Sequence, residues 1–143
     1  MGNFLNETGK QMIVDAIKDA ELNTSGEIRV HIESRCKEEV LDRAAHLFKK
    51  LQMHKTEQRN GVLFYLAHID RKFAILGDGG INQKVPENFW DTIKERMAER
   101  FKEGKFAEGM AEGIKESGQQ LKTHFPYQSD DVNELSDEIS FGE

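Results

Sequence analysis

Four residues from three separate stretches of the chain have side chains suited to binding a cation or a phosphate group. Glu27 and Asp78 supply carboxylates, and Asn60 supplies an amide oxygen. Such oxygen ligands are the ones that Ca²⁺ and Mg²⁺ prefer. We therefore predict a divalent-cation site formed by Asp78, Glu27 and Asn60. Arg59 precedes Asn60 and could hold a phosphate group beside this site through forked hydrogen bonds.

The hydropathy pattern predicts that these residues lie beside three strands. Residues 27–33 alternate between apolar and polar side chains, which is typical of a strand with one polar face. Residues 61–68 are almost continuously apolar, which predicts a central strand covered on both faces. Residues 72–77 form a third apolar run after a tight reversal, so the second and third runs predict a hairpin.

Apolar residues at helical spacing predict helices over residues 7–22 and 37–53 and in two segments that begin at Pro86 and Phe106. A helix between the first two strands makes them parallel, with a right-handed crossover. The starts of these two strands and the end of the third then share one edge of the sheet, where the four candidate residues meet. The order of elements implies an α/β fold, a three-layer α/β/α sandwich with a small mixed sheet.

A row of glycines recurs every four or five residues in the last predicted helices, at Gly104, Gly109, Gly113 and Gly118. A glycine inside a helix destabilises it by about 1 kcal/mol relative to alanine. The row therefore predicts a place where another backbone approaches closely. The alternative is that these glycines mark frayed helix ends.

Each part of the predicted cation site also has a simpler interpretation. The sequence Asp78-Gly79-Gly80 could be a turn in which the aspartate bonds its own backbone. Asn60-Gly61 could be a second turn, and Glu27 could pair with a lysine at the surface. These interpretations explain the same residue types without a bound ion.

The acidic charge is concentrated at the end of the chain. The protein has 143 residues and a formal net charge of −6, and from Pro126 onward it has acidic residues but no lysine or arginine. We therefore predict a folded domain over residues 1–125 and an acidic tail over residues 126–143, which we expect to be disordered.

The acidic tail contains apolar residues at helical spacing, Val132, Leu135 and Ile139. Such a segment could fold as a helix in the groove of a protein partner. The alternative is a tail that only keeps the protein in solution.

Composition argues against several classes of protein. The net charge of −6 argues against binding to nucleic acid or to an anionic membrane. No apolar run approaches the ~20 residues of a membrane span, and we see no secretory signal, so we expect a cytoplasmic protein without membrane insertion. The single cysteine, Cys36, lacks the phosphate-binding loop of cysteine phosphatases, and the five histidines are scattered, so we assign no catalytic residue.

Four short segments resemble the TPM domain in the right order and spacing: residues 25–30, 59–63, 75–81 and 101–106. This family includes the thylakoid-lumen acid phosphatases linked to photosystem II repair and many bacterial proteins of unknown role. The resemblance implies an α/β/α sandwich, a divalent-cation site and a phosphatase activity. It places Asp78, Glu27, Arg59 and Asn60 on motif positions of the family.

Two functions follow from these observations. The first is a non-catalytic interaction or regulatory module that binds a divalent cation, because no nucleophile accompanies the site and because the tail offers a segment for a partner. The second is a metal-dependent acid phosphatase that hydrolyses phosphate monoesters, in which the cation would polarise the phosphoryl oxygen. We favour the first.

Overall fold

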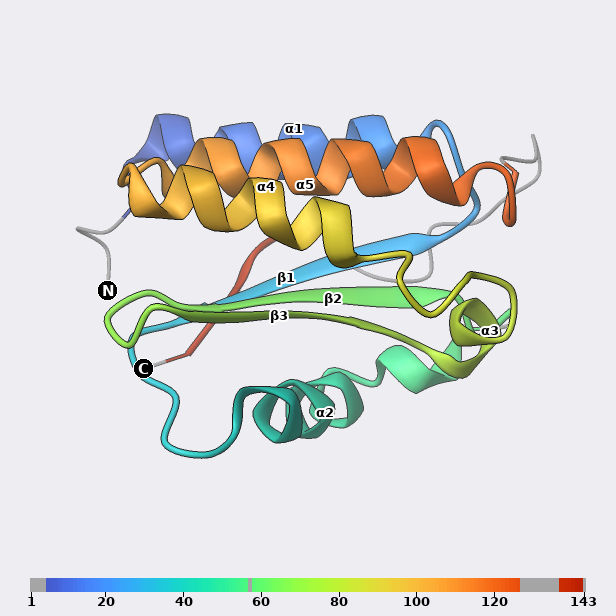
Figure 1. The fold of residues 1–143 in the computed structure, drawn as a ribbon, viewed down its shortest axis with the longest axis horizontal. Helices are drawn as coiled ribbons and strands as arrows, with labels where there is room; N and C mark the ends of the chain where they lie inside the picture. Colours follow the sequence, from blue (N-terminus) through green and yellow to red (C-terminus); the bar gives the residue numbers. More distant parts are fainter. Residues whose placement is uncertain (1–4, 57, 127–136, 143) are drawn as a thin grey trace.

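A mixed sheet lies between two layers of helices in the computed structural model (Figure 1). The structure describes residues 5–56, 58–126 and 137–142. Within them the elements follow one another as α1 (Glu7–Glu21), β1 (Glu27–Glu33), α2 (Val40–Lys50), η1 (Met53–Lys55), β2 (Gly61–Ala67), β3 (Lys72–Gly77), α3 (Gly79–Asn82), α4 (Asp91–Lys102), α5 (Phe106–Leu121) and β4 (Ser140–Phe141).

The helices cover both faces of the sheet, which confirms the three-layer α/β/α sandwich. Helices α1, α4 and α5 lie on one face, and α2 lies on the other (Figure 1). The alternation of strand side chains explains this arrangement, because Ile28, Val30 and Phe64 join the core beneath α1 and α5. Leu63 and Tyr65 point the other way and join a smaller core with α2.

The strand order is β3-β2-β1-β4. β1 and β2 are parallel, and β2 and β3 form an antiparallel hairpin, as the sequence predicts. β4 was not predicted. The charge pattern predicts a tail outside the folded domain for all residues after 125, but Ser140 and Phe141 pair with the edge of β1, opposite His31 and Ile32. This pairing covers backbone groups of an otherwise open edge strand.

Three local differences from the sequence prediction concern the helix ends. α2 is shorter than the predicted 37–53, and Gln52 after it takes a left-handed φ of 60°. α4 begins at Asp91 rather than at Pro86, because residues 86–90 form tight turns, including a bond from the Phe89 N–H to the Pro86 carbonyl. The Asp-Gly-Gly sequence, expected only to break β3, begins the short helix α3.

The glycine row allows close packing, but among Gly109, Gly113 and Gly118 the predicted approach of another backbone occurs at Gly118 alone. A Cβ at Gly118 would lie 2.7 Å from the Cα of Ala20, so the backbones of α5 and α1 approach directly. At Gly113 the neighbour is the side chain of Met97 on α4. Gly104 ends α4 with a left-handed φ of 78°, which favours glycine.

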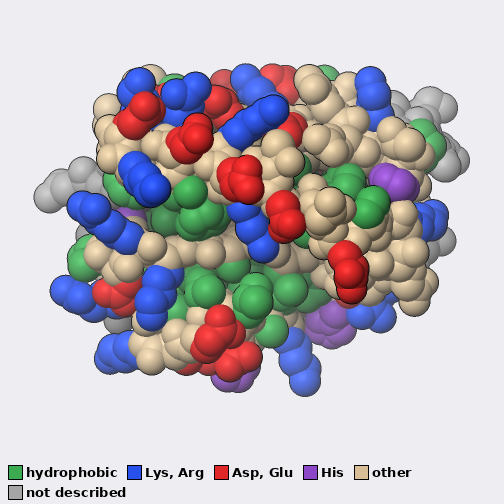
Figure 2. Space-filling model, viewed as in Figure 1, with side chains coloured by type: hydrophobic (Ala, Val, Ile, Leu, Met, Phe, Trp, Pro, Cys, Tyr) green, Lys and Arg blue, Asp and Glu red, His purple; other side chains and the backbone are tan. Residues whose placement is uncertain are grey.

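The surface carries the charge that the composition predicts. Figure 2 shows lysine and arginine side chains interspersed with aspartate and glutamate over the face it presents. In the part of the chain that the structure describes, no helix combines the length and the apolar character needed to cross a membrane.

Candidate functional site

The predicted site residues come together at one edge of the sheet. The Glu27 N–H donates to the Asn60 carbonyl at 3.1 Å, and the Asp78 N–H donates to the Gly61 carbonyl at 2.9 Å. Glu27 is opposite Gly61 in the register of β1 and β2, so Glu27 and Asp78 flank a residue without a side chain. The predicted threading of the sheet is therefore confirmed.

Asp78 caps the helix that follows it. Its Oδ1 accepts a bond from the Gly79 N–H at 2.7 Å, so the turn interpretation of the motif is correct for the local structure. Gly80 is required for packing, because a Cβ there would lie 2.3 Å from the carbonyl oxygen of Gln58 and 2.5 Å from that of Arg59. The loop before β2 thus rests directly on α3.

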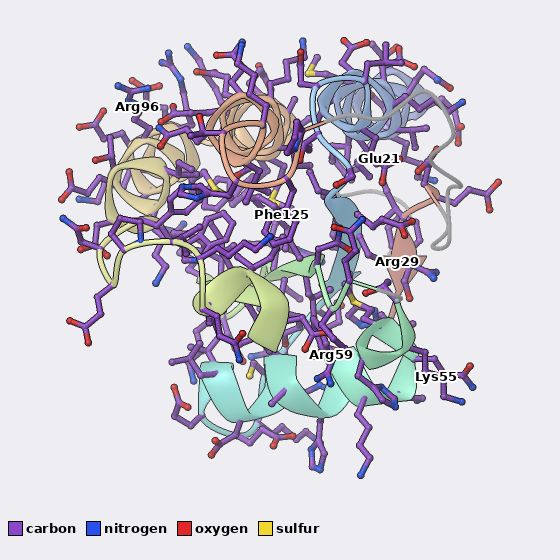
Figure 3. All side chains as sticks on the ribbon, turned by 90° about the vertical axis from the view of Figure 1, so that its right-hand side faces the viewer. Glu21, Arg29, Lys55, Arg59, Arg96 and Phe125 are labelled. Carbon is purple, nitrogen blue, oxygen red and sulfur yellow. The ribbon has the colours of Figure 1, made fainter. Side chains whose placement is uncertain are left out.

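Arg59 forms a forked ion pair with Asp78. Its Nε and Nη2 donate to the two carboxylate oxygens, each at 2.8 Å. The Asp78 side chain is 5% exposed, whereas that of Arg59 is 55% exposed. Figure 3 shows Arg59 between α3 and α2. Hydrogen bonding to Asp78 raises the pKa of the Arg59 guanidinium. The donors that we predicted for a phosphate group therefore point at the neighbouring carboxylate.

Asn60 is fixed in place but leaves one oxygen unused. Its N–H donates to the Thr56 hydroxyl at 3.2 Å, and its Nδ2 donates to the Ser25 carbonyl at 2.9 Å. The remaining Oδ1 is buried and has no hydrogen-bond partner in the part of the chain that the structure describes. A buried acceptor of this kind is unfavourable unless a donor, a water or a cation meets it.

Glu21 is an acidic neighbour that the sequence analysis did not single out. It lies at the end of α1 (Figure 3) and accepts a bond from the Ile28 N–H at 3.2 Å. Burial, a hydrogen bond with Asp137 and the charge of Glu27 raise the pKa of Glu21 to about 9. Within the described ranges, no group of three or more His, Cys, Asp or Glu side chains is placed to hold a metal ion. The predicted site of two carboxylates and one amide stays a prediction.

A second polar cluster lies at the opposite end of β1 and was missed by the sequence analysis. Glu33 is its centre, with a side chain 4% exposed. Arg43 donates to it from Nε and Nη2, each at 2.9 Å, and the Tyr65 hydroxyl donates as well. Burial opposes ionisation, but these hydrogen bonds lower the pKa of Glu33. Burial and the bond to Glu33 raise the pKa of Tyr65.

His31 connects this cluster to the end of the chain. Its Nε2 lies 3.3 Å from a Glu33 oxygen, and its Nδ1 lies 2.9 Å from the Ser140 hydroxyl. Burial lowers the pKa of His31, so the neutral ring is favoured. Serine, histidine and glutamate are the residue types of a hydrolase triad, but this glutamate is already held by Arg43 and Tyr65. We therefore interpret the chain of bonds as an attachment of β4 to β1.

The other residues singled out from the sequence either pack within the fold or lie outside the described residues. Val132 and Leu135 are not among the described residues. Ile139, expected on a partner-binding helix, is instead partly buried against the core of this protein, because β4 next to it joins the sheet. Cys36 is buried and donates to the Glu38 carbonyl, in agreement with an ordinary small side chain.

Comparisons with known proteins agree with this architecture. Residues 1–120 match the family model of the TPM domain. The chain is similar to the BA42 protein from the psychrophilic bacterium Bizionia argentinensis, with 47% sequence identity, a TM-score of 0.92, and coverage of 97% of this chain and 96% of that chain. A comparison with curated proteins gave no match.

Two more distant structures share the fold. The N-terminal domain of a protein from P. gingivalis is 20% identical, with a TM-score of 0.70 over 85% of this chain and 79% of that chain. The N-terminal domain of the cg2496 protein from Corynebacterium glutamicum is 12% identical, with a TM-score of 0.65 over 94% of this chain and 79% of that chain. The chain belongs to the TPM domain family, as the four sequence segments indicated.

Proposed function

We propose that this TPM domain binds a divalent cation, Ca²⁺ or Mg²⁺, and acts as a non-catalytic interaction or regulatory module. The observation that carries the proposal is the buried Asn60 Oδ1, which lacks a hydrogen-bond partner within the described residues. This atom belongs to the residue whose carbonyl bonds Glu27 and whose neighbour Gly61 bonds Asp78. An unused oxygen acceptor on a residue whose backbone is bonded to Glu27 suits a hard cation.

Binding a cation requires Arg59 to leave Asp78. Arg59 is the exposed member of the pair, and it sits in a left-handed conformation with φ of 52°. Asp78 would keep its bond to the Gly79 N–H if the guanidinium turned toward solvent, because that bond does not involve Arg59. The cation would then replace Arg59 as the counter-charge of Asp78, with Glu27 and Asn60 as further ligands.

This exchange of counter-charge gives the domain a way to signal. Residues 58 and 59 contact α3 through Gly80, so a change at Arg59 alters the surface formed by this loop and α3. A partner that contacts this surface would distinguish the cation-bound domain from the free one. The partner site proposed for Val132 and Leu135, and the cytoplasmic location, stay predictions.

The phosphatase alternative has weaker support in the geometry. A phosphate ester would have to compete with a buried carboxylate for the Nε and Nη2 donors of Arg59. The cation proposal needs only that an exposed side chain moves aside, which is why we favour the non-catalytic function.

The test is a Ca²⁺ titration of the whole chain, and a second one with Mg²⁺, followed by ¹H–¹⁵N NMR. We expect saturable shifts at residues 26–27, at Asn60 and at residues 77–81. Asp78→Asn should weaken binding at least tenfold. Asp15→Asn removes an exposed carboxylate on α1 and should leave the affinity unchanged. The same samples should not hydrolyse p-nitrophenyl phosphate.

Two outcomes would overturn the proposal in different ways. Shifts confined to residues 130–138 of the acidic tail, or an affinity unchanged by Asp78→Asn, would show that the predicted cation site is wrong. Metal-dependent turnover that disappears in Asp78→Asn would keep the site and establish the phosphatase alternative.

A further inference from the structure

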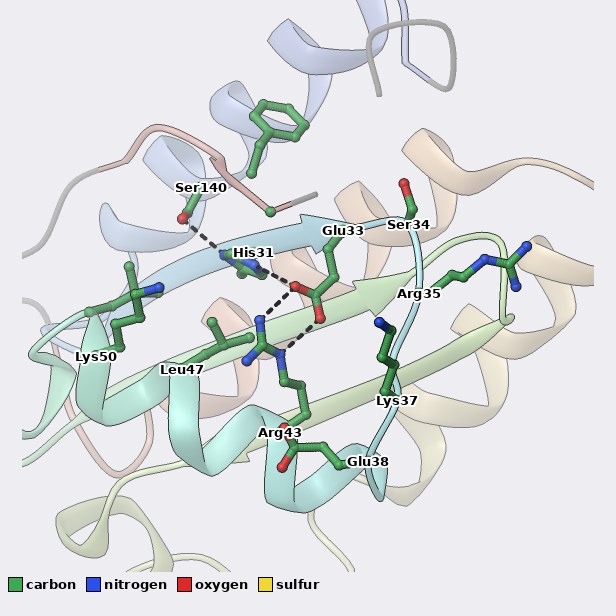
Figure 4. Close-up of a pocket in the computed structure, with 13 residues that line it drawn as sticks. His31, Glu33, Ser34, Arg35, Lys37, Glu38, Arg43, Leu47, Lys50 and Ser140 are labelled. Atoms are coloured by element: carbon green, nitrogen blue, oxygen red, sulfur yellow. Dashed lines mark hydrogen bonds and ion pairs between the residues drawn. The ribbon is translucent and has the colours of Figure 1, made fainter.

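A pocket with a volume of about 820 Å³ lies between α2 and the end of β4 (Figure 4). His31 and Glu33 at the end of β1 line it, so it is ~20 Å along the strand from the start of β1 at Glu27. Pockets that bind small molecules have volumes of about 300–1,000 Å³. This pocket is therefore large enough for a ligand and separate from the predicted cation site.

The buried acid in this pocket does not repel an anion. Glu33 accepts two bonds from Arg43, one from Tyr65 and one from the Nε2 of His31. The forked bond to Arg43 neutralises its charge, and both carboxylate oxygens are occupied. Glu38, the other acid in the lining, lies 3.4 Å from His46.

The basic side chains of the pocket have unused donors. Lys37 and Lys50 line it, and their side chains form no ion pair or hydrogen bond among the residues that the structure describes. Figure 4 shows their ammonium groups on either side of the Glu33–Arg43 pair, and the charge of Lys50 contributes to the lowered pKa of His31. Arg43 uses Nε and Nη2 for Glu33, which leaves Nη1 for another acceptor.

Apolar side chains form another part of the lining. Leu47 and Leu51 come from α2 and the turn after it, and Phe141 from β4 is 43% exposed. We propose that this pocket binds a small organic dianion, whose charged group contacts Lys37, Lys50 and Arg43 and whose apolar part lies against Leu47, Leu51 and Phe141. The charged group is a phosphate or a pair of carboxylates, since both place two negative charges on oxygen atoms.

The end of the chain is part of this binding site. Gly142 donates its N–H to the Ile32 carbonyl at 2.8 Å, and a Cβ at this position would lie 2.6 Å from Glu33 Oε1. Residues 140–142 therefore pack directly against Glu33 and His31 and form one wall of the pocket. A ligand held between α2 and this wall would stabilise the pairing of β4 with β1.

The test uses the whole ¹⁵N-labelled chain and three probes at constant ionic strength: phenyl phosphate, phthalate and inorganic phosphate. We expect saturable shifts at residues 34–38, at Arg43 and at residues 140–142 with at least one of the two aromatic dianions. The double variant Lys37→Gln/Lys50→Gln should weaken that binding at least tenfold. Lys49→Gln makes the same change on the neighbouring residue of α2 outside the pocket and should bind normally.

Each probe answers a separate question. Tighter binding of phenyl phosphate assigns a phosphate group to the ligand, and tighter binding of phthalate assigns carboxylates. Inorganic phosphate should bind more weakly than phenyl phosphate, because it lacks the apolar part. The proposal would be overturned if none of the three probes caused shifts at concentrations of tens of millimolar. It would also be overturned if the Lys49 variant and the double variant lost the same binding affinity.

Discussion

Two forked arginine–carboxylate pairs stand at opposite ends of the sheet, and they differ in how firmly the rest of the molecule holds them. Among the residues that the structure describes, the Asp78 carboxylate bonds Arg59 and the N–H of Gly79, and Arg59 is 55% exposed. Glu33 has Arg43, Tyr65 and His31, and Arg43 is 30% exposed. An arginine and a carboxylate therefore form one pair whose arginine is open to solvent and another pair that is fixed.

This difference suits the two ends to different tasks. A carboxylate whose counter-charge is exposed can exchange it for a cation more readily, because water solvates the arginine that leaves. A buried carboxylate held by several donors cannot do so, but it makes a rigid wall whose charge is already neutralised. The predicted cation site thus lies at the open pair, and the proposed anion pocket is built on the fixed pair.

Replacing each arginine by methionine separates the two ends most strongly. Arg43→Met leaves Glu33 buried without its counter-charge, so we expect the free energy of unfolding to fall by about 3–5 kcal/mol. Arg59→Met should lower it by about 1 kcal/mol or less, because solvent reaches Asp78 once the side chain is gone. Urea unfolding followed by circular dichroism measures both. Equal losses in the two variants would contradict the distinction.

A methyl group added at Gly80 should disturb the Asp78 end alone. The new Cβ would lie 2.3 Å from a backbone oxygen, so we expect Gly80→Ala to destabilise by about 1–3 kcal/mol and to shift the NMR signals of residues 58–60. Gly79→Ala is the matched control, because its Cβ has nothing within 4 Å, and it should stabilise by about 0.4–1 kcal/mol. Signals of His31 and Glu33 that move in Gly80→Ala would show that the two ends are coupled.

The pH dependence tests the acidic contact beside the Asp78 end. Glu21 has a pKa of about 9 in the folded protein against 4.5 in the unfolded chain. Between these values only the folded chain carries the proton, so the free energy of unfolding falls as pH rises from about 4.5 to 9, by at most about 1.4 kcal/mol per pH unit. Glu21→Gln should remove this slope, since an amide N–H replaces the proton toward Asp137.

Urea unfolding at pH 5, 7 and 8.5 measures the change of slope, with Asp15→Asn as the control. The difference in stability between Glu21→Gln and the unaltered chain should grow with pH. A constant difference would mean that Glu21 is ionised in the folded protein.

The Asp78 end was predictable from the sequence because its geometry follows from chain topology. A helix between two strands makes them parallel, and a hairpin reverses the third, so Glu27, Asn60 and Asp78 must reach one edge. The hydropathy pattern could not show that the guanidinium of Arg59 donates its hydrogen bonds to Asp78. This pairing depends on the conformation of the loop before β2 and on its close contact with Gly80. Neither feature can be read from the spacing of apolar residues.

The Glu33 end could not be assembled from local signals. The alternation of β1 did show a polar face that contains His31 and Glu33, and this was the only sequence signal for the cluster. Its other members come from a helix, from the neighbouring strand and from a segment 109 residues away along the chain. The charge pattern predicts a tail that includes Ser140, because acidic composition carries no information on two residues that pair with a strand edge.

Removing the Ser140 hydroxyl should give the smallest effect and the most local one. Ser140→Ala loses the bond to His31 but keeps the Gly142 N–H bond to the Ile32 carbonyl, so we expect a loss of about 1 kcal/mol in the local stability of β4. Hydrogen exchange of the Gly142 amide should accelerate roughly fivefold, while global unfolding in urea barely changes. Ser34→Ala, at the rim of the same pocket, is the control. If exchange at Gly142 stayed as slow as in the unaltered chain, β4 would be held by its backbone pairing alone, and the His31 contact would not fasten it to β1.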